Sequence, residues 1–206
     1  MSKLGIFMAD GCEEIEGLTV VDLVRRAGIE IEMISVSGEK TVTGSHKIDF
    51  QTDVSKADAD YASYDGIVLP GGMPGTTNLM EDDTVNRVIK EFATSGKLVA
   101  AICAAPSVLG NAGLLVGKKA TCYPGVEGKL TGADFVTDPV AKDGNIITSR
   151  GLGTAIEFAA EIVAYLLDES AAKSLKESVV LFHLLFLLHD HLLDHLSADR
   201  TSLLRS

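Results

Sequence analysis

A buried strand, a cysteine and the start of a helix follow one another in Leu98-Val99-Ala100-Ala101-Ile102-Cys103-Ala104-Ala105-Pro106. The first five residues are apolar and predict a strand that is covered on both faces. Small residues follow Cys103, and Pro106 suits the first turn of a helix, which we expect from Ala104 to about Asn111. This layout is that of a nucleophile elbow, where the reactive side chain lies on a sharp turn between strand and helix.

The rest of the chain alternates apolar runs of strand length with segments of helical period. Strands are predicted at residues 4–8, 29–36 and 66–70, with shorter ones near 119–122, 135–137 and 145–149, and a small hairpin at 41–50. One helix is expected from 82 or 83 to about 92 and another from 154 to about 167, and a first helix is indicated by Ile15, Leu18, Val21 and Val24. This order predicts an α/β fold with a mostly parallel sheet and helices on both faces.

Composition narrows the functional classes. The chain has 206 residues and a formal net charge of −11, and it lacks the basic patch by which proteins bind nucleic acid or anionic membranes. It shows neither a signal peptide nor an apolar run long enough to span a bilayer. Its three cysteines, Cys12, Cys103 and Cys122, form no C-x-x-C pair. We therefore expect a cytoplasmic protein of one main domain with free thiols and no bound metal.

Three loops are expected to meet at the carboxyl ends of the parallel strands: the loop after Met8, the loop after Pro70 and the turn at Cys103. The helix N-terminus beside Cys103 would favour the thiolate over the thiol. Gly71-Gly72 allows close approach of the backbone to a ligand.

The backbone N–H groups of this glycine pair and of Ala104 would form an oxyanion hole. Glu16 belongs to an acidic cluster after the first strand. A carboxyl group held beside a thiolate tends to stay protonated, so Glu16 is a candidate proton shuttle.

Five motifs then occur in a fixed order: Met8-Ala9-Asp10-Gly11-Cys12-Glu13-Glu14-Ile15-Glu16, Val24-Arg25-Arg26-Ala27-Gly28, Val68-Leu69-Pro70-Gly71-Gly72, Ala101-Ile102-Cys103-Ala104-Ala105-Pro106 and Thr148-Ser149-Arg150-Gly151-Leu152-Gly153-Thr154. Together they resemble the ThiJ/PfpI superfamily, and most closely its DJ-one branch of Parkinsonism-associated deglycases. The resemblance covers residues 1 to about 181. It implies a flavodoxin-like three-layer sandwich and usually a homodimer. It also implies a nucleophile at Cys103, a protonated acid at Glu16, and backbone donors at Gly72 and Ala104.

Two positions depart from the family pattern. Tyr123 stands where family members often carry a histidine, and a tyrosine there would donate a hydrogen bond rather than accept a proton. The peptidase-like branch has a histidine immediately after its cysteine, whereas this chain has Ala104. The absence of an adjacent Cys-His pair argues against protease activity.

The resemblance implies a cofactor-independent enzyme, either a glyoxalase III-type lyase or a protein deglycase. Cys103 would form a hemithioacetal with a methylglyoxal-type α-oxoaldehyde or act on its early glycation adducts, and a 2-hydroxy acid would leave. The sequence does not separate these two substrates. An alternative is a redox-sensing stress protein or chaperone that acts through oxidation of Cys103 to sulfinic acid. An amidotransferase would need a later histidine partner, and none lies between His46 and His183.

Two further features remain open at this level. Cys12 lies in the loop before Glu16 and is either structural or a resolving thiol for Cys103. Residues 182–206 form an apolar, His-rich extension that is predicted to be helical. His191 and His195 would share a helix face there, so the extension is either a docking helix without a catalytic role or a weak metal site.

Overall fold

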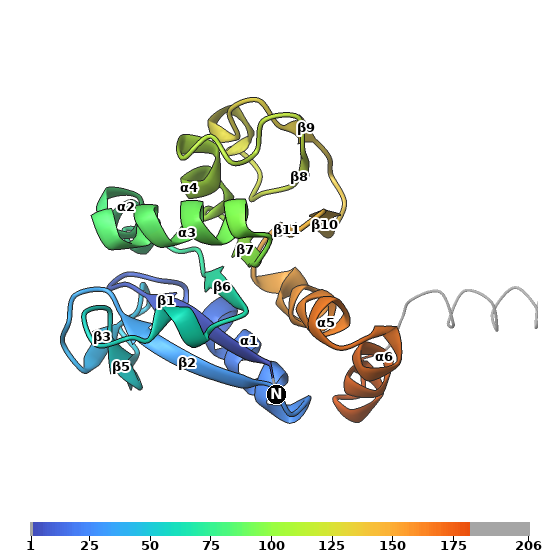
Figure 1. Cartoon of the computed structure of the whole chain (residues 1–206), viewed down its shortest axis with the longest axis horizontal. Coiled ribbons are helices and arrows are strands. Elements are labelled where there is room, and N and C mark those ends of the chain that lie inside the picture. Colours follow the sequence, from blue (N-terminus) through green and yellow to red (C-terminus); the bar gives the residue numbers. More distant parts are fainter. Residues whose placement is uncertain (1, 182–206) are drawn as a thin grey trace, which may run out of the picture. The chain divides into compact units, whose positions relative to one another are not determined.

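The computed structural model describes residues 2–181, and Figure 1 shows its elements in chain order. The strands are β1 (Lys3–Met8), β2 (Glu30–Ser35), β3 (Thr41–Thr43), β4 (Asp49–Gln51), β5 (Val54–Ser55), β6 (Gly66–Leu69), β7 (Leu98–Ile102), β8 (Lys119–Ala120), β9 (Asp134–Phe135), β10 (Val140–Asp143) and β11 (Ile146–Ser149). The α-helices are α1 (Glu14–Arg26), α2 (Gly75–Glu81), α3 (Asp83–Ser95), α4 (Pro106–Asn111), α5 (Ala155–Leu166) and α6 (Glu169–Ser178). Short 3₁₀ turns occupy Tyr61–Ser63, Glu127–Lys129 and Leu152–Thr154.

Seven of these strands form one sheet in the order β10-β11-β7-β6-β1-β2-β5. Every neighbouring pair is parallel except β10 and β11. The strand before Cys103, β7, lies between β6 and β11, and all five of its residues are buried. The mostly parallel sheet predicted from the alternation of elements is confirmed, and the carboxyl ends of β1, β6 and β7 share one edge.

Helices cover both faces of the sheet. The α1 and α5 helices pack together against one face, and α2, α3 and α4 cover the other (Figure 1). The α3 helix follows its sequence pattern closely: Asp82 caps it by accepting a hydrogen bond from the Val85 N–H at 3.0 Å, and its inward face joins the core. No helix in residues 2–181 is both long and apolar enough to cross a membrane.

The chain divides into two compact units, residues 1–175 and 176–206, with the boundary inside α6. All features of the candidate site belong to the first unit. The extension predicted at residues 182–206 lies outside the described residues, and so do His191 and His195.

Three sequence-based expectations need correction. Ile15 is 46% exposed, whereas the side chains of Glu14 and Glu16 in the same first turn of α1 are buried. Backbone N–H groups bind both carboxylates, and this allows the charged residues to take the inward positions. The helix after Cys103 begins at Pro106 rather than Ala104. The sequence pattern also missed α2 and the antiparallel strand β10.

Candidate active site

Cys103 lies immediately after β7 and adopts a left-handed backbone conformation, with φ at 66°. A non-glycine residue rarely takes this conformation, because its Cβ crowds the neighbouring carbonyl oxygen. Two hydrogen bonds hold it there. The Cys103 N–H donates to the Ser149 carbonyl at 2.9 Å, and the Cys103 carbonyl accepts from the Tyr123 N–H at 2.8 Å. The surrounding loops therefore stabilise a sharp turn that leaves the thiol half-exposed.

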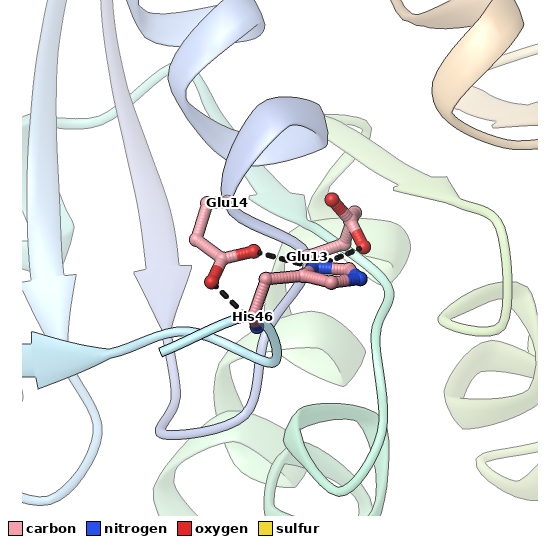
Figure 2. A group of neighbouring side chains, drawn as sticks. All are labelled: Glu13, Glu14 and His46. Carbon is pink, nitrogen blue, oxygen red and sulfur yellow. Dashed lines mark hydrogen bonds and ion pairs between the residues drawn. The ribbon is translucent and has the colours of Figure 1, made fainter. Parts of the chain in front are cut away.

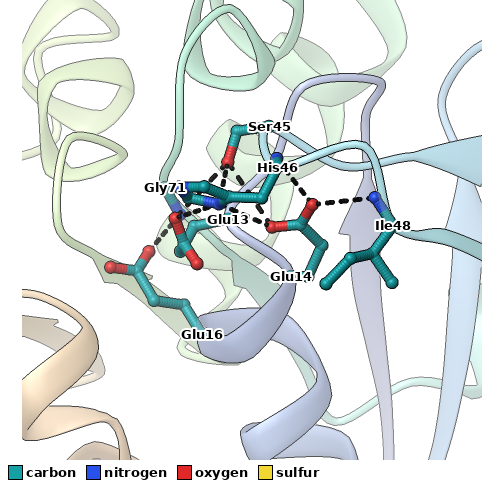
Figure 3. Close-up of polar contacts among 7 residues, drawn as sticks. All are labelled: Glu13, Glu14, Glu16, Ser45, His46, Ile48 and Gly71. Atoms are coloured by element: carbon teal, nitrogen blue, oxygen red, sulfur yellow. Dashed lines mark hydrogen bonds and ion pairs between the residues drawn. The ribbon is translucent and has the colours of Figure 1, made fainter.

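Glu16 reaches the same place from the first turn of α1. Its side chain is only 1% exposed, and its Oε2 accepts a hydrogen bond from the Gly71 N–H at 2.9 Å (Figure 3). The other oxygen, Oε1, has no hydrogen-bond partner among residues 2–181. Since Oε2 is occupied as an acceptor, Oε1 is the atom on which a proton would sit.

Gly71 allows the thiol and the carboxyl to come together. A Cβ at this position would lie 2.6 Å from the Cys103 Cβ and 2.7 Å from Glu16 Oε2. Any side chain would therefore push the two residues apart. The Gly71 carbonyl is also fixed, because it accepts a hydrogen bond from the Glu13 N–H at 2.9 Å.

The predicted backbone donors lie beside the sulfur. The N–H groups of Gly72 and Ala104 interact with Cys103 and lower the pKa of its thiol. Gly72 has φ at 87°, a conformation that favours glycine. The Gly71 N–H is bound to Glu16, so Gly72 and Ala104 remain as the two donors available to an anion.

The electrostatics of Cys103 differ from the sequence-based expectation. Burial and the Glu16 carboxylate raise the pKa of the Cys103 thiol to about 12, although Ala104 and Gly72 act in the opposite direction. Burial likewise raises the pKa of Glu16 to about 7. The expected lowering by the helix N-terminus fails because α4 begins three residues beyond Cys103 and burial outweighs the donors that remain. The two groups therefore compete for one proton across the neutral range.

Tyr123 and Gly151 lie at the rim of this site. A Cβ on Gly151 would lie 3.3 Å from the Tyr123 ring and 3.8 Å from both Cys103 Sγ and Glu16 Oε1. Gly151 therefore lies next to both the sulfur and the unpaired carboxyl oxygen, and its lack of a side chain keeps that position free of further atoms. The Tyr123 side chain is 53% exposed.

The other two cysteines differ from Cys103 in access. Cys12 and Cys122 are free and fully buried. Burial raises the pKa of Cys12 to about 12 and that of Cys122 to about 11. Among the described cysteines, Cys103 alone combines solvent access with backbone donors.

Sequence reasoning missed two contributors and a neighbouring cluster. Gly71 was proposed as an anion donor, but its N–H positions Glu16 instead. Gly151 stood within a recognised motif without an assigned role. Glu13, Glu14 and His46 form a group of potential metal ligands next to the site (Figure 2). His46 is 32 residues from Glu14 in sequence, so no local spacing could reveal this contact.

Known proteins resemble this chain over most of its length. The model of the DJ-1/PfpI family matches residues 2–165. The chain is 38% identical over 180 residues to the Parkinson disease protein 7 homolog of Danio rerio, covering 85% of this chain and 95% of that protein. It is 34% identical over 184 residues to the glutathione-independent glyoxalase DJR-1.2 of Caenorhabditis elegans, covering 87% and 96%. The crystal structure of Drosophila melanogaster DJ-1beta superposes with a TM-score of 0.85 at 35% identity, covering 89% of this chain and all of that one.

Proposed function

Because this chain belongs to the DJ-1/PfpI family, we propose that it is a cofactor-independent glyoxalase acting on methylglyoxal-type α-oxoaldehydes. The glyoxalase relative from Caenorhabditis elegans supports this class of activity. The reaction is an internal rearrangement followed by addition of water. The aldehyde carbon is oxidised and the neighbouring ketone carbon is reduced, so no external electron acceptor is needed.

One observation carries the proposal: the Cys103 thiol and the buried Glu16 carboxyl meet over Gly71, and the sulfur and the unpaired Oε1 both lie beside Gly151, where a Cβ would be 3.8 Å from each. A nucleophile and a proton carrier at one point are what this chemistry requires. The N–H groups of Gly72 and Ala104 lie beside the sulfur, where they would stabilise the oxygen anion that forms when it attacks a carbonyl.

The proposed sequence of steps is balanced within the active site. Cys103 Sγ adds to the aldehyde carbon, and the thiol proton ends on the aldehyde oxygen to give a hemithioacetal. Glu16 then carries the hydrogen of that carbon, as a proton, to the neighbouring carbon through an enediol. The product is a thioester of a 2-hydroxy acid. Water cleaves the thioester, which releases the acid and restores the thiol.

Two alternatives use the same residues. In deglycation, Cys103 would act on adducts of the aldehyde with amino, thiol or guanidino groups. In redox sensing, the half-exposed Cys103 would be oxidised to sulfinic acid, and the donors at Gly72 and Ala104 would bind the new oxygens. A sensor without enzymatic activity would form no 2-hydroxy acid from an aldehyde.

The test is direct: purified protein is incubated with methylglyoxal, and lactate is measured with a stereospecific assay. We expect turnover by the wild type and a loss on the order of 10³-fold or more in Cys103→Ala and Cys103→Ser. The serine variant keeps the size of the side chain but lacks a nucleophile of comparable strength.

Cys122→Ala is the matched control, since it removes a thiol that is buried away from solvent. It should retain turnover. Near wild-type lactate formation by Cys103→Ser would refute the nucleophile assignment. The rate of lactate formation from free methylglyoxal is then compared with the rate from a preformed adduct. A rate from the adduct that does not exceed the rate from free aldehyde would favour the glyoxalase over the deglycase.

A further inference from the structure

A second group of polar atoms converges beside the active site without taking part in the proposed reaction. Glu13 and Glu14 lie at the start of α1, and His46 lies in the turn between β3 and β4 (Figure 2); Ser45 precedes it in the same turn (Figure 3). The ligand atoms of Glu13, Glu14 and His46 all lie within 4.8 Å of one another. Glu14 is only 1% exposed, whereas His46 lies at the surface, so the cluster opens to solvent on one side.

The spacing of these atoms is regular. His46 Nδ1 lies 3.1 Å from Glu14 Oε2 and 3.4 Å from Glu13 Oε2. Ser45 Oγ lies 3.1 Å from the same nitrogen, 3.4 Å from Glu13 Oε2 and 3.5 Å from Glu14 Oε2. Four ligands placed about 2.0–2.1 Å from a tetrahedral Zn²⁺ are separated from one another by about 3.3–3.4 Å. The five distances given above are close to this spacing, and the ligand atoms of the two carboxylates lie within 4.8 Å of each other.

The surroundings of Glu14 hold its carboxylate in this orientation. Its Oε1 accepts hydrogen bonds from the backbone N–H groups of His46 at 2.7 Å and Ile48 at 3.4 Å (Figure 3). The other oxygen, Oε2, is therefore directed at the cluster. In known metal sites, hydrogen bonds from the surrounding protein orient the ligands in the same way.

Gly44 supplies an independent sign that the site is shaped around this carboxylate. A Cβ at position 44 would lie 2.1 Å from the Glu14 carboxyl group. The turn is fixed on the other side by the Ser45 N–H, which donates to the Cys12 carbonyl at 2.8 Å. The turn can therefore contact the buried Glu14 carboxylate only because residue 44 is a glycine.

The charge of the cluster is not balanced by a permanent cation. Within residues 2–181, the ion pairs of Glu13 and Glu14 are both with His46, and no Lys or Arg forms a salt bridge with either carboxylate. A divalent ion would neutralise the two carboxylates. One imidazole nitrogen with carboxylate oxygens suits a first-row transition metal, whereas Mg²⁺ and Ca²⁺ prefer oxygen ligands alone.

We propose that Glu13, Glu14 and His46 bind one Zn²⁺ ion, with Ser45 Oγ or a water molecule as the fourth ligand. The site is separate from the nucleophile, although the Glu13 N–H bonds to Gly71, which in turn positions Glu16. The proposal does not depend on the proposed function, and its test measures the metal rather than turnover.

The experiment is a calorimetric titration of chelator-treated full-length protein with ZnCl₂. All samples carry Cys103→Ala, so that the reactive thiol does not compete for the metal. We expect the parent to bind one equivalent at this site. His46→Arg should lose it, because Arg keeps a cation beside both carboxylates, and thus the turn, but cannot ligate Zn²⁺. Glu13→Gln should bind Zn²⁺ at least about tenfold more weakly.

His191→Arg is the matched control, because it makes the same substitution in the His-rich extension, and it should bind like the parent. Zinc-edge X-ray absorption of the parent should show nitrogen and oxygen ligands near about 2.0 Å and no sulfur. The proposal is overturned if the parent binds no zinc, if His46→Arg retains the equivalent, if His191→Arg loses it, or if a sulfur ligand from Cys12 is seen.

Discussion

The titratable groups of Glu16 and Cys103 lie next to each other at one buried place, and this determines how the proposed activity should depend on pH. Burial raises the pKa of Glu16 to about 7, and burial together with the Glu16 charge raises that of Cys103 to about 12. Below pH 7 both groups are protonated and no thiolate is present. As the pH rises through about 7, the pair loses one proton, and the remaining proton is shared between carboxyl and sulfur.

We therefore expect kcat/KM for methylglyoxal to rise with pH through an apparent pKa of about 7 and then to level off. Glu16→Gln should lose this rise and reduce turnover by about 10²-fold or more, because an amide cannot carry protons. Glu16→Leu should also lose turnover, but its thiolate absorbance in the ultraviolet should appear at lower pH than in the wild type, because the carboxyl that raises the pKa of Cys103 is gone. The profiles are measured in chelator-containing buffer. Full turnover in Glu16→Gln would make Glu16 a positioning residue only.

At the scale of single residues the sequence predicts Cys103 and Glu16 as site residues, since each follows an apolar strand and the carboxyl ends of these strands share one edge of the sheet. It could not supply the direction of the shift in the pKa of Cys103. That direction depends on burial by segments distant in sequence, and on the carboxyl of Glu16 interacting with the sulfur. Charged residues on the same helix or strand can be read from the sequence, whereas the effect of desolvation on a pKa depends on the folded chain.

In the loop after β6, residue 71 has no room for a side chain. We predict that Gly71→Ala destabilises the protein by about 1–3 kcal/mol, the usual range for overpacking. The added methyl would lie 2.6 Å from the Cys103 Cβ and 3.0 Å from the Ile102 carbonyl oxygen. Urea unfolding gives the change in the free energy of unfolding. Gly128→Ala is the control, because nothing lies within 4 Å of its added methyl. Equal stability of the two variants would contradict the prediction.

The sequence predicted a helix or strand correctly where the residues of that element themselves carry a clear pattern. The strand from Leu98 to Ile102 agrees residue for residue, because a short apolar run bounded by Gly96 and by the Cys103 turn is typical of a buried strand. The α2 helix was missed because Gly75-Thr76-Thr77-Asn78 has low helix propensity and no apolar period. Ile15 belongs to the apolar period that predicted α1, yet it is exposed, and the hydrogen-bonded carboxyl groups of Glu14 and Glu16 are buried instead. Tertiary hydrogen bonds decide such positions.

For the whole molecule, the resemblance to the ThiJ/PfpI superfamily implies a homodimer. Light scattering coupled to size exclusion should give twice the chain mass of 21.7 kDa. Truncation after Leu181 should preserve the dimeric state and the turnover, because every motif of the site precedes residue 155. A monomeric wild type would contradict the first expectation. A folded, soluble truncation with a large loss of kcat would show that the extension contributes to the site.

The burial of Glu16 affects whether the hydrogen of the aldehyde carbon exchanges with solvent during turnover. A carboxyl that is 1% exposed exchanges its proton with bulk water only when the site opens. If Glu16 takes the hydrogen from the aldehyde carbon and returns it to the neighbouring carbon between openings, the atom stays with the molecule. Methylglyoxal deuterated at the aldehyde carbon should then yield lactate that retains deuterium at C2 in ordinary water, as mass spectrometry can measure. Complete loss of the label would mean that solvent reaches the carboxyl within each turnover.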